Sequence, residues 1–331
     1  MTAEPTHSKA YVAGVVCLYW VVSISLVYVN KYLVTSDAIP LFITWFQCLI
    51  TCVICWFCGW MGHRAKAKDG LQSAQKSIFS TFPRAQYDPL TVWNVMPLSF
   101  IFVAMIVFNQ LTLKYVAVSF YNVARSLTIV FNALFSYIIL RTTVSLPTIL
   151  CLMIVITGFF VGSAGEVEFS RLGSVCGVLA SVFVSLNSIF TKRILPYVNN
   201  DAWRLAFINN ANACFLFLPF IYFYEREILI DVRSHYKSIF TIPFWGSMIV
   251  AGFLGFSIGI VTVMQAITSP LTHNISGTAK AAVQSAMAFY IWGNPATIMA
   301  CLGIFLVLSG SALYTKVKLW ENKKGPIPLP R

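Results

Sequence analysis

Long apolar runs follow one another through almost the whole chain, and they limit its fold more than any other feature. Each run is close to the length of about 20 residues that an α-helix needs to cross a bilayer. Hydrophobic residues make up 58% of the sequence and charged residues only 10%, whereas roughly a quarter of a soluble domain is charged. The sequence therefore predicts an all-α integral membrane protein with ten transmembrane helices, at about residues 10–30, 41–61, 93–113, 118–140, 146–163, 172–191, 203–224, 243–264, 271–291 and 295–315.

The segments between these runs predict how the chain is inserted. The longest of them, residues 62–92, is too short to form a core, and residues 1–9 lack the basic region of a signal peptide, so we expect the first run to be retained as a span. Most of the 23 lysines and arginines lie in the segments on the side of the two termini. The positive-inside rule therefore predicts cytosolic termini. Because the positive charges follow this rule, the net charge of +12 indicates contact with membrane lipid and not binding to nucleic acid.

Arg125 and Lys280 are the only charged residues well inside predicted spans, and no predicted span contains an Asp or Glu. A cation at the centre of a span costs about 2.5–3.5 kcal/mol on insertion scales, so such residues usually face a pathway. The alternatives are snorkelling, for which Lys280 is too deep, and pairing with an intramembrane carboxylate, which the chain lacks. We therefore expect an anionic substrate, and phosphate suits both an ammonium and a guanidinium. The lack of carboxylates also favours facilitated transport or anion exchange over proton or sodium coupling.

An internal likeness predicts a repeat. Residues 121–140 align with residues 273–292, which pairs Asn122 with Asn274. Because each repeat would hold five helices, the two would be inserted in opposite orientations, as in alternating-access carriers with a substrate site near the midplane. The predicted division is a first five-helix repeat at 1–163, a second at 164–315 and a cytosolic tail at 316–331.

Small and polar residues surround the lysine of the ninth predicted span. Gly277, with Ser276 and Thr278 beside it, removes side-chain bulk one turn before Lys280, which lets a ligand or another backbone approach closely. Asn274 begins a glycosylation sequon, but we expect it to be unmodified because it lies within a span. These residues are therefore candidates for the substrate site.

Uncharged side chains in other spans add further candidates. Asn209 and Asn210 have carboxamides that can read the edge of a nucleobase, or that can bond to neighbouring helices. Lys31 at the end of the first span is a candidate, although it also suits an interfacial anchor. The remaining candidates lie within a turn of Arg125 or near the end of the first span: Tyr121, Asn122, Tyr28 and Asn30.

The nine cysteines do not form a disulfide pattern. Four of them recur at helical spacing with no histidine among them, which favours helix packing over a metal site: Cys48, Cys52, Cys55 and Cys58. We expect neither a metal nor a catalytic cluster.

Three segments carry a resemblance to a known family: FYNVARSLTIVFNALFSYIIL, WRLAFINNANACFLFLPF and TSPLTHNISGTAKAAVQS. They resemble the nucleotide-sugar transporters of the drug/metabolite transporter superfamily, and among these the GDP-fucose carriers. GDP-sugar carriers have an F-Y-N-N motif that faces guanine and ribose, and a G-x-x-x-K motif whose lysine meets the phosphates. The first corresponds here to residues 207–210, with Ile208 in place of the tyrosine. The second corresponds to Gly277 and Lys280, with one residue fewer between them.

The resemblance implies a Golgi membrane protein that imports GDP-fucose from the cytosol in exchange for GMP, with no cofactor and no catalysis. Asn209 and Asn210 would read the base, and Gly277 and Lys280 would hold the diphosphate. Three alternatives stay open: a carrier of GDP-mannose, of a UDP-sugar or of a sugar phosphate; an integral membrane transferase; and a structural subunit. The oligomeric state is also open, with a homodimer among the options.

Overall fold

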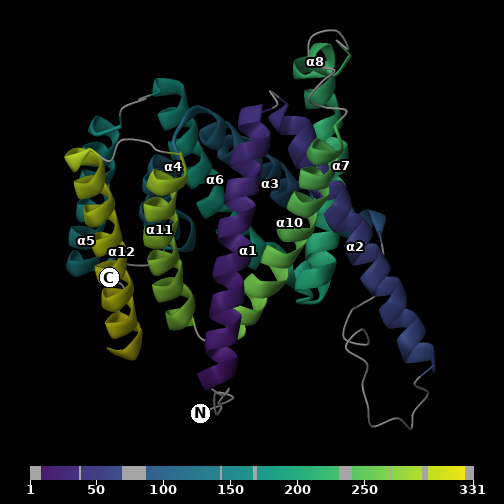
Figure 1. Ribbon diagram of the computed structural model, residues 1–331. Helices are drawn as coiled ribbons and strands as arrows, with labels where there is room; N and C mark the ends of the chain where they lie inside the picture. The colour runs from purple at the N-terminus through teal and green to yellow at the C-terminus, as the bar shows by residue number, and fades with distance from the viewer. Residues whose placement is uncertain are drawn as a thin grey trace. The chain divides into compact units, whose positions relative to one another are not determined.

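The computed structural model describes residues 9–36, 39–68, 87–141, 144–166, 170–230, 241–268, 270–292 and 297–324, and every regular element in these ranges is a helix (Figure 1). Ten of the helices are long: α1 (Lys9–Ser36), α2 (Pro40–Lys68), α3 (Pro89–Tyr115), α4 (Val118–Leu140), α5 (Leu146–Ala164), α6 (Arg171–Ile194), α7 (Ala202–Tyr224), α10 (Ile242–Thr268), α11 (Pro270–Trp292) and α12 (Ile298–Lys324). Two short elements are the 3-10 helix η2 (Leu195–Val198) and α8 (Arg226–Ile230).

Nine helices in the described ranges are long and apolar enough to cross a membrane. These nine confirm the all-α integral membrane fold. The remaining long helix, α11, is not among them because it carries a lysine and several uncharged polar residues in its 23 positions. The expectation that α11 is a tenth span therefore stays a prediction.

Several helices extend beyond the apolar runs. α2 continues from the predicted end at residue 61 to Lys68, and α12 continues from residue 315 to Lys324, into the segment predicted as a tail. Both extensions are rich in lysine and alanine or other good helix formers, so helix propensity persists where hydropathy falls. α12 begins only after Thr297, whose hydroxyl accepts a hydrogen bond from the Ala300 N–H and caps the helix.

The chain divides into two compact units. Unit 1 comprises residues 1–31, 108–185 and 257–331, and unit 2 comprises residues 32–107 and 186–256. Each unit contains residues from both predicted repeats, so the helices that pack together are not simply consecutive in the sequence. The inverted repeat itself stays a prediction.

In unit 1, α5 and α12 lie side by side through glycines (Figure 1). A Cβ atom on Gly303 of α12 would lie 2.3 Å from the Cα of Gly162 on α5, and one on Gly158 would lie 2.8 Å from the Val307 nitrogen. Small residues permit this close approach of backbones, which is a common way of packing membrane helices.

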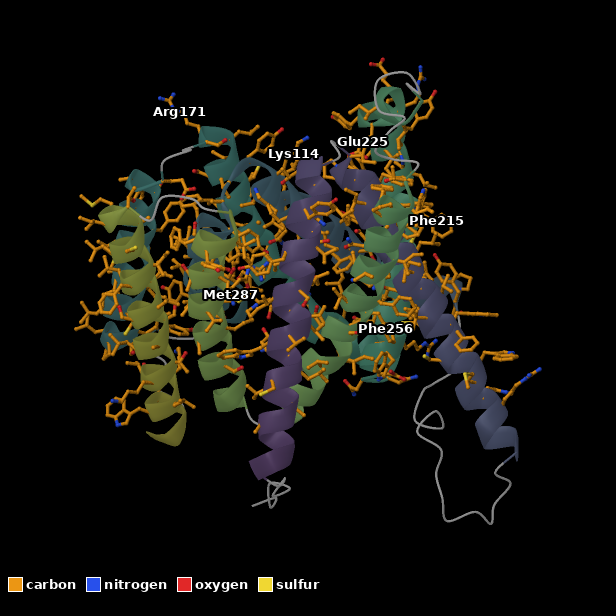
Figure 2. The ribbon with its side chains drawn as sticks, viewed as in Figure 1. Lys114, Arg171, Phe215, Glu225, Phe256 and Met287 are labelled. Carbon is orange, nitrogen blue, oxygen red and sulfur yellow. The ribbon has the colours of Figure 1, made fainter. Side chains whose placement is uncertain are left out.

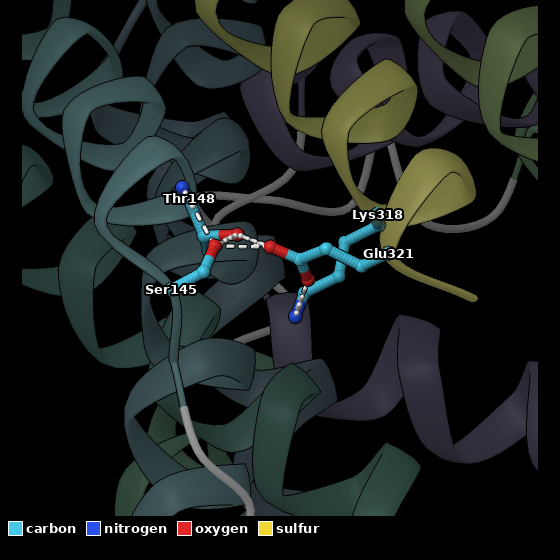
Figure 3. Close-up of polar contacts among 4 residues, drawn as sticks. All are labelled: Ser145, Thr148, Lys318 and Glu321. Carbon is cyan, nitrogen blue, oxygen red and sulfur yellow. Dashed lines mark hydrogen bonds and ion pairs between the residues drawn. The ribbon is translucent and has the colours of Figure 1, made fainter. Parts of the chain in front are cut away.

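A carboxylate joins the same two helices at one end (Figure 3). Glu321 of α12 accepts hydrogen bonds from the hydroxyls of Ser145 and Thr148 at the first turn of α5, the second over 3.0 Å, and it pairs with Lys318 over 2.8 Å. Ser145 in turn caps α5 by accepting from the Thr148 N–H. A negative charge is favourable at a helix N-terminus, so Glu321 stabilises this end of the pair.

Unit 2 is built around α2 and α7. Glu225, labelled at the end of α7 in Figure 2, accepts hydrogen bonds of 2.8 Å from the backbone N–H groups of both Leu41 and Phe42 in the first turn of α2. Asp201 caps the start of α7 by accepting from two backbone N–H groups. Large apolar side chains cover the outside of the helices, as Phe215 does on α7, where it is 65% exposed (Figure 2). Such a surface suits contact with lipid.

Candidate functional site

A cavity of about 470 Å³ lies within unit 1. It is lined by α1, α4, α11 and α12, and both Lys280 and Arg125 reach it. Among the described residues that line it there is no aspartate or glutamate. The described residues that line it are Tyr19, Ser23, Leu26, Val27, Tyr121, Asn122, Val123, Arg125, Ser126, Ile129, Gly277, Lys280, Ala281, Gln284, Ser285, Ile304, Val307, Leu308 and Ser311.

Lys280 is held by neutral groups of α1. Its Nζ atom donates a hydrogen bond to Ser23 Oγ over 2.7 Å and lies 5.5 Å from the centre of the Tyr19 ring. A hydroxyl and an aromatic face orient an ammonium group without neutralising it. The charge of Lys280 is therefore available to an anion in the cavity.

Arg125 is positioned by an asparagine of α3. Its Nη1 atom donates to Asn109 Oδ1 over 2.8 Å, and the same oxygen accepts from the Tyr121 hydroxyl over 3.2 Å. The guanidinium carbon lies 5.9 Å from the centre of the Tyr121 ring. A guanidinium has five N–H donors, so this contact leaves donors for phosphate oxygens.

The residues of α11 that line the cavity include three at helical spacing. Gly277, Lys280 and Gln284 are three and four residues apart and share one side of the helix. A Cβ atom on Gly277 would meet no atom of the described residues within 4 Å, so none of them requires a glycine here, and its small size leaves room in the cavity. Next to it, Ser276 is buried and accepts a hydrogen bond of 2.8 Å from the indole N–H of Trp20.

The candidates of the first span are used in contacts between helices. Tyr28 donates to the backbone oxygen of Gln284 over 2.7 Å, and Lys31 donates to the carbonyls of Leu113 and Val116 at the end of α3, over 2.6 and 2.9 Å. Neither these two residues nor Asn30 line the cavity. The side chains of Asn274 and Thr278 lie outside the part of the chain that the structure describes.

The α4 candidates do line the cavity. Tyr121 makes the contact with Asn109 described above, and Asn122 donates to Ser285 Oγ of α11 over 3.0 Å. Sequence reasoning missed four polar groups that lie with them. The available signal was an uncharged polar residue within a strongly apolar run, and it applies to Asn109, Ser23, Gln284 and Ser285.

In unit 2, the three asparagines of α7 have different surroundings. Asn212 is 1% exposed and fully engaged, because it donates to Ser99 Oγ over 3.1 Å and accepts from the Tyr87 hydroxyl over 3.0 Å. Asn210 donates to the Ala206 carbonyl of its own helix over 2.8 Å. Asn209 is 7% exposed, and its Oδ1 atom is buried with no hydrogen-bond partner among the described residues.

Comparison with known proteins identifies the family. The model of the Triose-phosphate Transporter family matches residues 11–315. The GDP-fucose transporter 1 of Monosiga brevicollis is 43% identical over 319 residues, which cover 95% of this chain and 92% of the relative. A Drosophila melanogaster protein named GDP-fucose transporter, Golgi, is 39% identical over 323 residues, with 93% and 90% of the two chains covered.

A solved crystal structure shows the same fold at low sequence identity. It has a TM-score of 0.55 and 16% identity, and the match covers 96% of this chain and all of the other. The family match, which spans nearly the whole chain, is the stronger finding. The protein is therefore a transporter and belongs to the Triose-phosphate Transporter family.

Proposed function

We propose that the protein imports GDP-fucose from the cytosol into the Golgi lumen in exchange for GMP. The observation that carries the proposal is the unit 1 cavity, whose described lining residues include two cations and no carboxylate. Such a site lacks a built-in counter-ion, so a substrate phosphate would supply it. Relatives named GDP-fucose transporter, at 43% and 39% identity over nearly the whole chain, support the choice of sugar and the Golgi membrane.

The charges of the two exchanged molecules suit the same site. A nucleotide diphosphate sugar carries one negative charge on each of its two phosphates, and a phosphate monoester such as GMP carries about −1.5 to −2 at pH 7. Both would therefore be neutralised by Lys280 and Arg125. With exchange, the cavity changes sides with an anion bound in each direction, so the two cations need not be reoriented without a counter-ion.

We propose that Asn209 reads the guanine base, because its carboxamide oxygen is buried and has no hydrogen-bond partner in the described part of the chain. A guanine edge has N–H donors that such an oxygen can accept, and Asn210 would add a donor or acceptor beside it. Transport would follow alternating access between the two sides of the membrane. The termini would be cytosolic, as the distribution of lysine and arginine predicts.

A ligand panel tests the substrate. We would measure the thermal stability of the purified protein with GMP, GDP-fucose, GDP-mannose, UMP, a UDP-sugar and a triose phosphate. Ligands that bind the folded state raise its melting temperature. The proposal expects stabilisation by GMP and GDP-fucose and little by the uridine nucleotides. Stabilisation by UMP but not GMP would identify a UDP-sugar carrier, and stabilisation by triose phosphate alone would identify a sugar-phosphate carrier.

A further inference from the structure

Gln284 is an unusual residue within the cavity. It is 1% exposed, it lies one helical turn from Lys280, and it lines the cavity wall. Both polar atoms of its side chain, Oε1 and Nε2, are buried and have no hydrogen-bond partner among the described residues. A carboxamide buried in this way lowers stability, because folding removes its hydrogen bonds to water without replacing them by hydrogen bonds within the protein.

Neighbouring polar groups of the cavity are occupied. Ser285, the next residue, accepts the Asn122 amide, and Ser23 accepts the Lys280 ammonium. The backbone oxygen of Gln284 itself accepts the Tyr28 hydroxyl. Among the described lining residues, Gln284 is the one with buried side-chain polar atoms that have no hydrogen-bond partner.

The chemistry of the amide limits its ligand. Nε2 needs an acceptor and Oε1 needs a donor. A phosphate group offers acceptors only, so it would satisfy Nε2 but would leave Oε1 facing a negative charge. A hydroxyl both donates and accepts, and a sugar presents several hydroxyls close to a phosphate.

We propose that Gln284 binds a hydroxyl group of the sugar that is joined to the substrate phosphate, while Lys280 and Arg125 bind the phosphate itself. This inference rests on the proposed nucleotide-sugar function and adds a residue that contacts the sugar. The hydroxyl can belong to the hexose or to the ribose of the nucleotide. The two sources differ because GMP contains only the ribose.

The test compares Gln284→Met with a matched control, Gln110→Met. Gln110 is also in unit 1, is 3% exposed and has an unpartnered Oε1 atom, but it does not line the cavity. For each purified protein we would measure the melting temperature without ligand and the affinities for GDP-fucose and GMP. Binding of GDP-fucose to the wild-type protein tests the proposed function itself. The comparison of the two variants then tests the role of Gln284.

In Gln284→Met we expect the melting temperature to be kept or raised and the affinity for GDP-fucose to be lowered. Gln284→Met should melt at the same or a higher temperature, because methionine removes the unsatisfied groups at similar volume. Its affinity for GDP-fucose should fall about tenfold, because a hydrogen-bonded hydroxyl loses its partners. Gln110→Met should leave both affinities unchanged.

The GMP measurement identifies the source of the hydroxyl. An unchanged GMP affinity in Gln284→Met assigns the residue to the hexose, and an equal loss for both ligands assigns it to the ribose. Unchanged affinity for both ligands would overturn the proposal. A variant that melts at a clearly lower temperature or fails to fold would also overturn it, because the amide would then have a structural role.

Discussion

Arg125 and Asn109 are joined by a hydrogen bond of 2.8 Å from Nη1 to Oδ1. The bond links α4 to α3 within unit 1, and the same oxygen holds the Tyr121 hydroxyl. The guanidinium that lines the cavity is thus fixed in place by a neutral acceptor, which leaves its positive charge for the substrate.

Asn109→Leu should weaken substrate binding although Asn109 does not itself line the cavity. The substitution removes the acceptor that orients Arg125, and losing a hydrogen bond to a charged group typically costs about 1.5–3 kcal/mol. We expect an affinity for GDP-fucose that is lower by roughly tenfold or more. Equilibrium binding to the purified variant measures this effect. Arg125→Lys is the companion variant, since it keeps the charge but loses the planar fork. Wild-type affinity in both variants would contradict a role of Arg125 in the site.

Two glycines should respond differently to alanine. In Gly303→Ala the new methyl group would lie 2.3 Å from the Cα of Gly162, so we expect a loss of about 1–3 kcal/mol in stability from overpacking of α5 against α12. In Gly277→Ala the methyl group meets nothing within 4 Å, so stability should not fall while substrate affinity does.

Melting temperatures and GDP-fucose affinities of the two variants separate these effects. Gly255→Ala is the control, because no described atom lies within 4 Å of the methyl group that it adds, and Gly255 belongs to unit 2 and is not among the cavity's described lining residues. Tight binding by Gly277→Ala would show that the substrate does not approach this face of α11.

Replacing Asn212 or Asn209 of α7 by alanine should have different effects on stability and on GMP affinity. Asn212→Ala should destabilise the protein by about 1–3 kcal/mol, because it removes a buried carboxamide that donates to the Ser99 hydroxyl and accepts from the Tyr87 hydroxyl. Asn209→Ala removes an oxygen that has no partner, so stability should be kept while the affinity for GMP falls. Thermal melting with and without GMP measures both quantities. Equal losses of stability in the two variants would contradict the assignment of Asn209 to the base.

The membrane fold was readable from the sequence because apolar runs of span length dominate it. The ends of the helices were less readable, since residues such as those at 62–68 of α2 are polar yet favour helix. Their charge made Lys280 and Arg125 candidates in the sequence, and both line the cavity, while their binding to substrate stays a prediction. An uncharged polar residue such as Asn109 is much less conspicuous in an apolar run than a charged one.

The contacts between side chains of the site could not be predicted from the sequence, because they join residues that are far apart in the chain. Lys280 bonds to Ser23, 257 residues earlier in the chain, and no local pattern predicts that pair. Lys31 looked similar to the other cations in sequence, but the structure places it on the carbonyls at the end of α3. Which face of a helix a residue occupies therefore decides whether it lines the cavity.

The most direct test of the central claim is uptake of labelled GDP-fucose into liposomes that contain the purified protein and are either loaded with GMP or left without it. The wild type should take up GDP-fucose faster into GMP-loaded liposomes, and Lys280→Ala should lose this uptake while remaining folded. Uptake that depends neither on internal GMP nor on Lys280 would contradict guanine-nucleotide exchange through the unit 1 cavity.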